Sequence, residues 1–275
     1  VQEDVNLSAV DGQEADVTQQ GVTITSASDA TVSVPENFSQ FDNGNIAQAL
    51  EISADNVTID GLTLEGKDAG INGIAMPDDN TLNTSVTNNN IANFTGSDAI
   101  KLIANDGGSS DVESLDVSSN TLTGLDANGI NLDLTDFDDG TTDTVTVDSN
   151  TIETVSGTVI QLTSDGSEDV DLTVSSNGID DTTQAATGID VDNFQSNVDI
   201  SGGSINGTDT GIISSTDLGS FLNISSVDLT NIGSSSAINV GHDTTLNVDD
   251  VTADGSSSAT GLTLGSASID AEVTN

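Results

Sequence analysis

Aspartate-rich loops recur through the middle of this 275-residue chain, and the richest of them spans residues 136–143. That loop, DFDDGTTD, places four carboxylates around Gly140, whose conformational freedom allows a tight turn. Calcium accepts about six to eight oxygen ligands and tolerates irregular geometry, whereas magnesium demands a stricter octahedron. We therefore expect a calcium site formed by this loop and its neighbours, with the candidate ligands Asp136, Asp138, Asp139, Asp143, Asp106, Asp111, Asp165 and Asp169.

The same loops have a simpler interpretation. The segment at residues 136–143 does not match an EF-hand, whose loop ends in Glu at its twelfth position, and the glycine-rich nonapeptide calcium repeat is absent. A hydrated acidic edge that keeps the protein soluble would need no bound metal. Both interpretations remain open at the level of sequence.

The overall charge restricts the partners of the protein. The chain carries 46 acidic residues against two lysines and no arginine, which gives a formal net charge of −44. Phosphate recognition needs Lys and Arg, so neither a nucleic acid nor an anionic membrane surface is an expected partner. No apolar run reaches the roughly 20 residues of a membrane-spanning helix. Self-repulsion of this size needs screening, so we expect a secreted or cell-surface protein in a salt-rich or calcium-rich exterior.

A repeat of 24 to 31 residues determines where these loops lie. Each repeat contains a core aliphatic residue, a second apolar residue two positions earlier, a third five positions later and a fourth 12 to 15 positions later. An apolar period of two is typical of strands, and a unit that cannot bury its own apolar face must stack on its neighbours. The core positions are Ile24, Ile59, Val86, Val117, Val147, Val174, Ile200, Ile224 and Val248.

These spacings predict an all-β solenoid of about nine coils with parallel strands along each face. At about 4.8 Å per coil it would be a rod roughly 40 Å long. We expect one domain, with residues 1–49 as an irregular N-terminal coil or capping segment and residues 50–275 as the solenoid. Asn89, Asn120, Asn150 and Asn177 each follow a core residue by three positions. In register they would stack as a hydrogen-bonded ladder at a turn, where Asn tolerates a left-handed backbone.

Coils of the type VTVDSNTI resemble the right-handed parallel β-helix, or pectin-lyase-like, superfamily over residues 50–264. The resemblance implies a right-handed, single-stranded parallel β-helix and leaves the function open, because enzymes and surface structural proteins share this fold. Pectate lyases of the superfamily typically use Arg as the base, and this chain has none. The pattern is therefore similar to that of the non-enzymatic surface and adhesin members.

Sites for other chemistry are weak in this sequence. Paired carboxylates for glycoside hydrolysis are inevitable in so acidic a chain and carry little information. Lys67 and Lys101 fall on different faces of different coils, and His242, the single histidine, follows a strand in a turn. We expect no catalytic residues and no enzymatic activity. A carbohydrate-binding or polysaccharide-degrading β-helix protein is the alternative, and surface polysaccharide is a possible partner for either function.

The ends of the predicted rod suggest how the protein could assemble. Neither end of the sequence contains an amphipathic helix that would cover the last coil, and open strand edges pair readily with other chains. We therefore expect end-to-end homopolymers formed through the terminal coils, as in an extracellular filament or biofilm matrix. A stalk segment excised from a large adhesin would show the same features.

Overall fold

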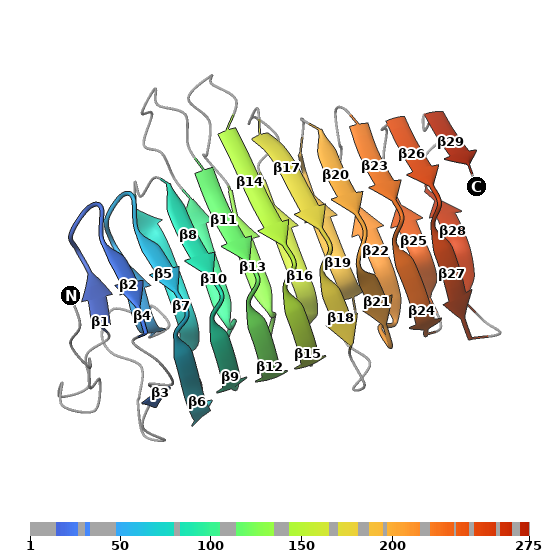
Figure 1. The fold of residues 1–275 in the computed structure, drawn as a ribbon. Helices are drawn as coiled ribbons and strands as arrows, with labels where there is room; N and C mark the ends of the chain where they lie inside the picture. The colour runs from blue at the N-terminus through green and yellow to red at the C-terminus, as the bar shows by residue number, and fades with distance from the viewer. Residues whose placement is uncertain are drawn as a thin grey trace.

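The computed structural model describes residues 15–26, 31–33, 48–79, 83–104, 114–134, 143–164, 170–180, 187–194, 197–214, 221–233, 235–241, 245–256, 259–265 and 270–274. Throughout these ranges the regular structure is β-strand, and no helix long and apolar enough to cross a membrane occurs in them. The strands pair in parallel into three sheets, and the chain visits the three sheets in turn, once per coil. Figure 1 shows the strands stacked side by side from β1 at one end to β28 and β29 at the other.

Sheet A contains ten strands. In spatial order they are β1 (Ala15–Val17), β4 (Gln48–Ile52), β7 (Asn72–Asp79), β10 (Ile100–Ala104), β13 (Ile130–Asp133), β16 (Thr158–Thr163), β19 (Thr187–Asp192), β22 (Thr210–Ser214), β25 (Ser236–Val240) and β28 (Thr260–Leu264).

Sheet B also contains ten strands. They are β2 (Thr23–Thr25), β5 (Thr58–Asp60), β8 (Thr84–Thr87), β11 (Ser114–Ser118), β14 (Asp143–Asp148), β17 (Val170–Ser175), β20 (Val198–Ser201), β23 (Phe221–Ser225), β26 (Thr245–Asp249) and β29 (Asp270–Thr274).

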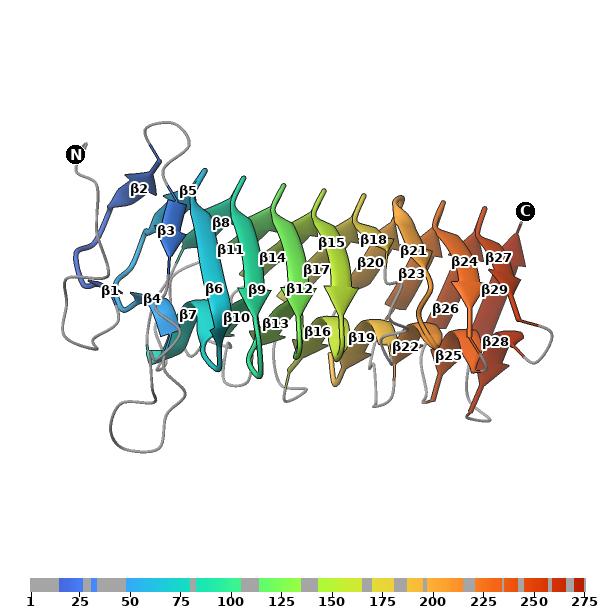
Figure 2. The same ribbon diagram turned by 90° about the horizontal axis from the view of Figure 1, so that it is seen from below.

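Sheet C contains nine strands. They are β3 (Thr31–Ser33), β6 (Thr63–Ala69), β9 (Asn90–Phe94), β12 (Thr121–Leu125), β15 (Thr151–Val155), β18 (Gly178–Asp180), β21 (Ser204–Asn206), β24 (Asp228–Ile232) and β27 (Thr252–Gly255). Seen from below, sheet C closes the third side of the stack (Figure 2).

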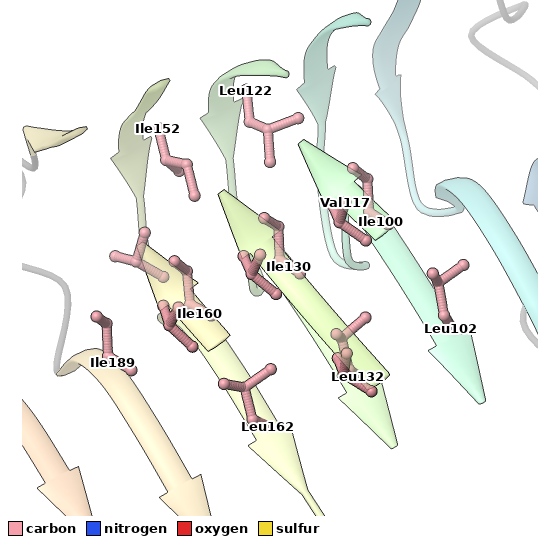
Figure 3. Packing of buried hydrophobic residues seen from close by; sticks show 14 of the residues in the cluster. Ile100, Leu102, Val117, Leu122, Ile130, Leu132, Ile152, Ile160, Leu162 and Ile189 are labelled. Atoms are coloured by element: carbon pink, nitrogen blue, oxygen red, sulfur yellow. The ribbon is translucent and has the colours of Figure 1, made fainter. Parts of the chain in front are cut away.

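The protein is a parallel β-solenoid, as the repeat predicted, and its geometry is compatible with the expected right-handed winding. Ile100 pairs with Ile130, Ile130 with Ile160, and Ile160 with Ile189 on successive coils of sheet A. Figure 3 shows these side chains following one another along the inside of the wall. The core residues of sheets B and C pair in the same one-to-one manner, for example Val117 with Val147. One continuous apolar core therefore runs along the rod.

The number of coils is slightly larger than expected. Sheet B has a tenth strand, β29, in which Val273 pairs with Val248. The expected core positions end at Val248, and the next coil has Ala271 in place of a large apolar residue two positions before Val273. At the other end, residues 15–17, 23–25 and 31–33 pair with β4, β5 and β6, so part of the expected irregular segment at 1–49 forms a regular coil. Its residues 1–14, 27–30 and 34–47 lie outside the described part of the chain.

The left-handed residue at each corner between sheets B and C differs from the expected one. The residue with positive φ is the one before each ladder asparagine: Asn88, Ser119, Ser149 and Ser176 have φ of 55° to 57°. The asparagine that follows is turned into the core and buried. A small polar residue therefore adopts the left-handed conformation at each corner, and the side chain of the asparagine after it forms hydrogen bonds inside the solenoid.

Candidate functional site

The three richest acidic loops leave and rejoin the solenoid on adjacent coils. They connect β10 to β11, β13 to β14 and β16 to β17, and the flanking strand ends are in register: Ile103 pairs with Asp133, which pairs with Thr163. Neighbouring strands in a sheet are about 4.8 Å apart. The attachment points of the loops therefore form a row along one edge of the rod, between sheets A and B, as the repeat predicted.

Of the eight candidate calcium ligands, only Asp143 belongs to the described residues. It is the first residue of β14, only 2% exposed, and it pairs with Val170 of β17. Its burial follows the alternation of β14, whose residues 143, 145 and 147 all face the core. Asp143 thus sits on the inner side of its strand and not on an exposed ridge.

The other seven candidates, Asp136, Asp138, Asp139, Asp106, Asp111, Asp165 and Asp169, lie outside the described residues. Within the described ranges, no group of three or more His, Asp or Glu side chains is placed so that it could hold a metal ion. Calcium binding by the loops therefore stays a prediction from sequence.

Asp190 is an unusual acid on the outer side of sheet A. Its backbone lies in β19 between Gln161 of β16 and Ile213 of β22. One carboxylate oxygen, Oδ1, is buried without a hydrogen-bond partner. Burial, followed by repulsion from Asp192 two residues later, raises the pKa of Asp190 to about 6. The side chain is therefore an acid that the fold partly desolvates.

The expected asparagine ladder is present and fully buried at its centre. The Oδ1 atom of Asn150 accepts hydrogen bonds from the backbone N–H of Asn120 at 2.9 Å and from its Nδ2 at 3.0 Å. The Nδ2 of Asn120 also donates to the carbonyl of Val86 at 2.8 Å. The same pattern links Asn89 to Asn120 and Asn150 to Asn177. At this corner the ladder therefore supplies a hydrogen-bond acceptor to the backbone N–H of each asparagine and a donor to a main-chain carbonyl of an earlier coil.

A second polar ladder was missed by the sequence interpretation. It lies at the corner before sheet A, where Asn72, Asp98 and Asn128 occupy equivalent positions. The Oδ1 of Asn72 accepts from the backbone N–H of Asp98 at 3.0 Å, and the Oδ1 of Asp98 accepts from that of Asn128 at 3.1 Å. The signal in the sequence is an Asn or Asp followed by a small residue and an isoleucine, as in Asn128–Gly129–Ile130.

Sheet B carries its carboxylates in a regular arrangement on its outer face. Two outer rows run along the rod, one through Asp116 and Asp199 and the other through Asp60 and Asp148. Within the described residues of both rows, each carboxylate has only Ser, Thr or Asn as its neighbours on adjacent strands.

These neutral neighbours donate hydrogen bonds to the carboxylates. Ser175 Oγ donates to Asp148 at 2.5 Å, and Asn223 Nδ2 donates to Asp199 at 2.7 Å. Because two charges about 5 Å apart repel, this alternation lowers the electrostatic cost of the acidic face. Sheets A and C do not follow this rule, because Asp16 stands next to Glu51 in sheet A and Glu153 stands next to Asp180 in sheet C.

The last coil exposes apolar side chains. Val273 in β29 is 61% exposed and Leu264 in β28 is 43% exposed. Their counterparts one coil earlier, Val248 and Val240, are buried. These two residues therefore occupy core columns and are exposed in the last described coil.

The two lysines lie on different sheets, as expected. Lys101 is in β10 of sheet A, where it pairs with Ala75 and Asn131, and Lys67 is in β6 of sheet C. His242 lies outside the described residues.

Comparisons of this chain with protein-family models, with curated proteins and with solved structures find no match. The architecture therefore rests on the strand register itself. A parallel β-solenoid is what the structure establishes.

Proposed function

We propose that this protein is an extracellular structural protein, a subunit of a self-assembling filament or matrix, related to the non-enzymatic surface members of the pectin-lyase-like superfamily. The observation that carries the proposal is the regular rod itself, with one continuous apolar core inside and carboxylates that alternate with hydroxyl or amide residues on the outer face of sheet B. Stacked coils that each contact only their neighbours make an extended structure, which suits a protein whose function is its shape.

The filament and the stalk segment of a large adhesin differ in what pairs with β28 and β29, which have a neighbouring strand on one side only within the described residues. In a filament a second copy would pair with these edges, because unpaired strand edges are templates for another chain. In a stalk, further coils of the same chain would cover them.

The acidic surface supports an extracellular role that depends on cations. Copies with a net charge of −44 repel each other strongly unless salt or divalent cations screen them. Assembly of such a subunit is therefore favoured by high ionic strength, and calcium in the acidic loops would lower the charge further.

Electron microscopy and light scattering of the purified chain test this function. We expect concentration-dependent fibres with a rod-length axial repeat at molar salt or millimolar calcium, and separate rods at low salt. Separate rods under all conditions would contradict the filament and favour the stalk. Turnover of a polysaccharide by the same sample would favour the carbohydrate-active alternative instead.

A further inference from the structure

Five asparagines of the described residues begin the sequence Asn-x-Ser or Asn-x-Thr, the acceptor of N-linked sugars in secreted proteins. A chain so rich in Asn, Ser and Thr contains such sequences by chance, so the structure has to separate accessible acceptors from blocked ones. The reacting atom is the side-chain nitrogen, Nδ2, which must be exposed and not held by a neighbour. The five are Asn56, Asn83, Asn93, Asn206 and Asn223.

Hydrogen bonds across the coils hold the side-chain nitrogens of Asn206 and Asn223. Nδ2 of Asn206 donates to Oδ1 of Asp180 at 2.8 Å, and Nδ2 of Asn223 donates to Oδ1 of Asp199 at 2.7 Å. Both asparagines lie within strands and are only partly exposed. Thr208, the hydroxyl residue of the first of these sequences, is completely buried. Both sequences are therefore blocked in the folded protein.

The side-chain nitrogens of Asn83 and Asn93 are also held. Nδ2 of Asn83 donates to Oδ1 of Asn56 at 3.3 Å, and Oδ1 of Asn83 accepts from Ser114 Oγ at 3.1 Å. Asn83 is only partly exposed, whereas Asn93 is exposed and donates from Nδ2 to Oε1 of Glu65 at 2.5 Å. A hydrogen bond to a charged group must break before Asn93 can react, which lowers its reactivity by about tenfold.

Asn56 differs from the other four asparagines. It is exposed, and its φ of 58° places it in the left-handed region at the corner between β4 and β5. Its Oδ1 accepts the hydrogen bond from Asn83, and no hydrogen bond between described residues uses its Nδ2. Val57 is buried and Thr58 begins β5, so the backbone beside Asn56 is fixed. A sugar on Nδ2 would leave Oδ1 free to keep its contact with Asn83.

We propose that Asn56 is an N-glycosylation site and that the fold protects the other four described asparagines. The donor is an oligosaccharide linked through diphosphate to a lipid carrier. Nδ2 of Asn56 forms a bond to the anomeric carbon of the sugar as the bond from that carbon to the phosphate oxygen breaks. The phosphate leaves with the bonding electron pair, and Nδ2 loses one proton to a base of the transferase. This inference rests on the extracellular location in the proposed function.

The position of Asn56 on the rod suits a bulky group. Residues 53–57 connect β4 of sheet A to β5 of sheet B, so Asn56 lies on the same edge of the rod as the acidic loops of later coils. This corner is near the β1 end of the rod (Figure 1). A sugar attached there extends from the edge between two sheets and displaces no strand pairing.

Glycosylation of the folded, purified chain tests the site, with a purified oligosaccharyltransferase and a lipid diphosphate-linked oligosaccharide. Mass spectrometry of peptides is expected to find the sugar on Asn56 at about tenfold higher occupancy than on Asn93, and none on Asn206. Synthetic peptides with the same three acceptor sequences, which no fold protects, should be modified alike. Asn56→Gln should remove the sugar and Asn206→Gln should leave it. Equal occupancy of Asn56 and Asn206 in the folded chain would overturn the proposal.

Two substitutions of Glu65 test whether a held nitrogen is what protects Asn93. Glu65 lies at an outer position of β6 between Ser33 and Ala92, so neither substitution touches the core. Glu65→Ala removes the acceptor and should raise the occupancy of Asn93 about tenfold in the same assay. Glu65→Gln keeps an oxygen acceptor and should raise it less. Unchanged occupancy in both variants would overturn the protection by hydrogen bonds on which the choice of Asn56 rests.

The protein isolated from its natural source separates this inference from the proposed function. A sugar on Asn56 is expected there, and its absence would overturn the modification whatever the transferase does with the purified chain. Fibres formed by a chain without the sugar would leave the filament standing. A sugar on Asn56 of a chain that forms no fibres would support the modification and contradict the filament.

Discussion

Asn120 donates two hydrogen bonds, from its backbone N–H and its Nδ2, to the single Oδ1 atom of Asn150 on the next coil. Each asparagine in the ladder thus supplies an acceptor for the coil before it and a donor to an earlier main-chain carbonyl. The solenoid is thereby joined along its axis at a corner as well as by the sheets.

We expect Asn120→Ala to destabilise the protein by about 2–4 kcal/mol, because it leaves the buried donors of Asn89 without their acceptor. Chemical denaturation with circular dichroism measures the change. Asn90→Ala, at an exposed position in β9, is the control and should shift the midpoint little. Equal effects of the two substitutions would contradict a structural role for the ladder.

Ile130→Ala should cost about 2–5 kcal/mol, because Ile130 is fully buried between Ile100 and Ile160 and its removal leaves a cavity. The midpoint of thermal unfolding is the measurement, with Thr144→Ala on the exposed side of β14 as the control. A loss below about 1 kcal/mol would mean that the column is not packed as described.

Two glycines with similar positive φ allow the cost of left-handed backbone strain to be measured separately from the cost of a steric clash. A Cβ at Gly203, with φ of +75°, would lie 2.2 Å from the carbonyl oxygen of Asn177, whereas a Cβ at Gly61, with φ of +71°, meets nothing within 4 Å. Gly61→Ala should cost only the left-handed strain, about 1–2 kcal/mol. Gly203→Ala should cost clearly more in the same unfolding assay, and a smaller loss than for Gly61→Ala would contradict the close approach of the two coils.

Asp190 should make stability depend on pH between about 4 and 6. Its pKa is raised from 3.8 to about 6 in the folded protein, so the native state holds the proton more tightly than the unfolded state. The resulting penalty is absent below pH 4, grows as pH rises towards 6 and is constant above it. After allowance for solvent screening of this partly exposed group, it amounts to roughly 1–2 kcal/mol.

Asp190→Asn should therefore raise the melting temperature at pH 8 and have little effect at pH 4. Asp171→Asn, at an exposed position in β17, is the control for removing one charge from this acidic chain. If Asp190→Asn stabilises the protein equally at pH 4 and pH 8, the raised pKa of Asp190 is wrong.

Calcium should raise the melting temperature beyond the effect of equal ionic strength in sodium chloride, because a ligand of the native state stabilises it. Asp136→Asn together with Asp138→Asn should reduce this extra shift. The outer-row pair Asp60→Asn with Asp148→Asn removes the same charge outside the loops and should leave the shift unchanged. If chelation, sodium and calcium at matched ionic strength give the same melting curve, the calcium site is wrong.

The sequence by itself determined the solenoid, because its apolar residues recur at a spacing that only stacked coils can bury. Identical residues recur at equivalent positions of successive coils, so their columns could be assigned from the sequence. One column contains Ile100, Ile130 and Ile160, and one ladder contains Asn89, Asn120, Asn150 and Asn177.

The tertiary structure alone decided features that depend on which neighbour each side chain meets. It turned Asp143 inward with its strand, and it desolvated Asp190, whose strand neighbour is Ile213. Neither burial nor the pairing of carboxylates with hydroxyl groups can be read from one coil, because both are set by the coils above and below it.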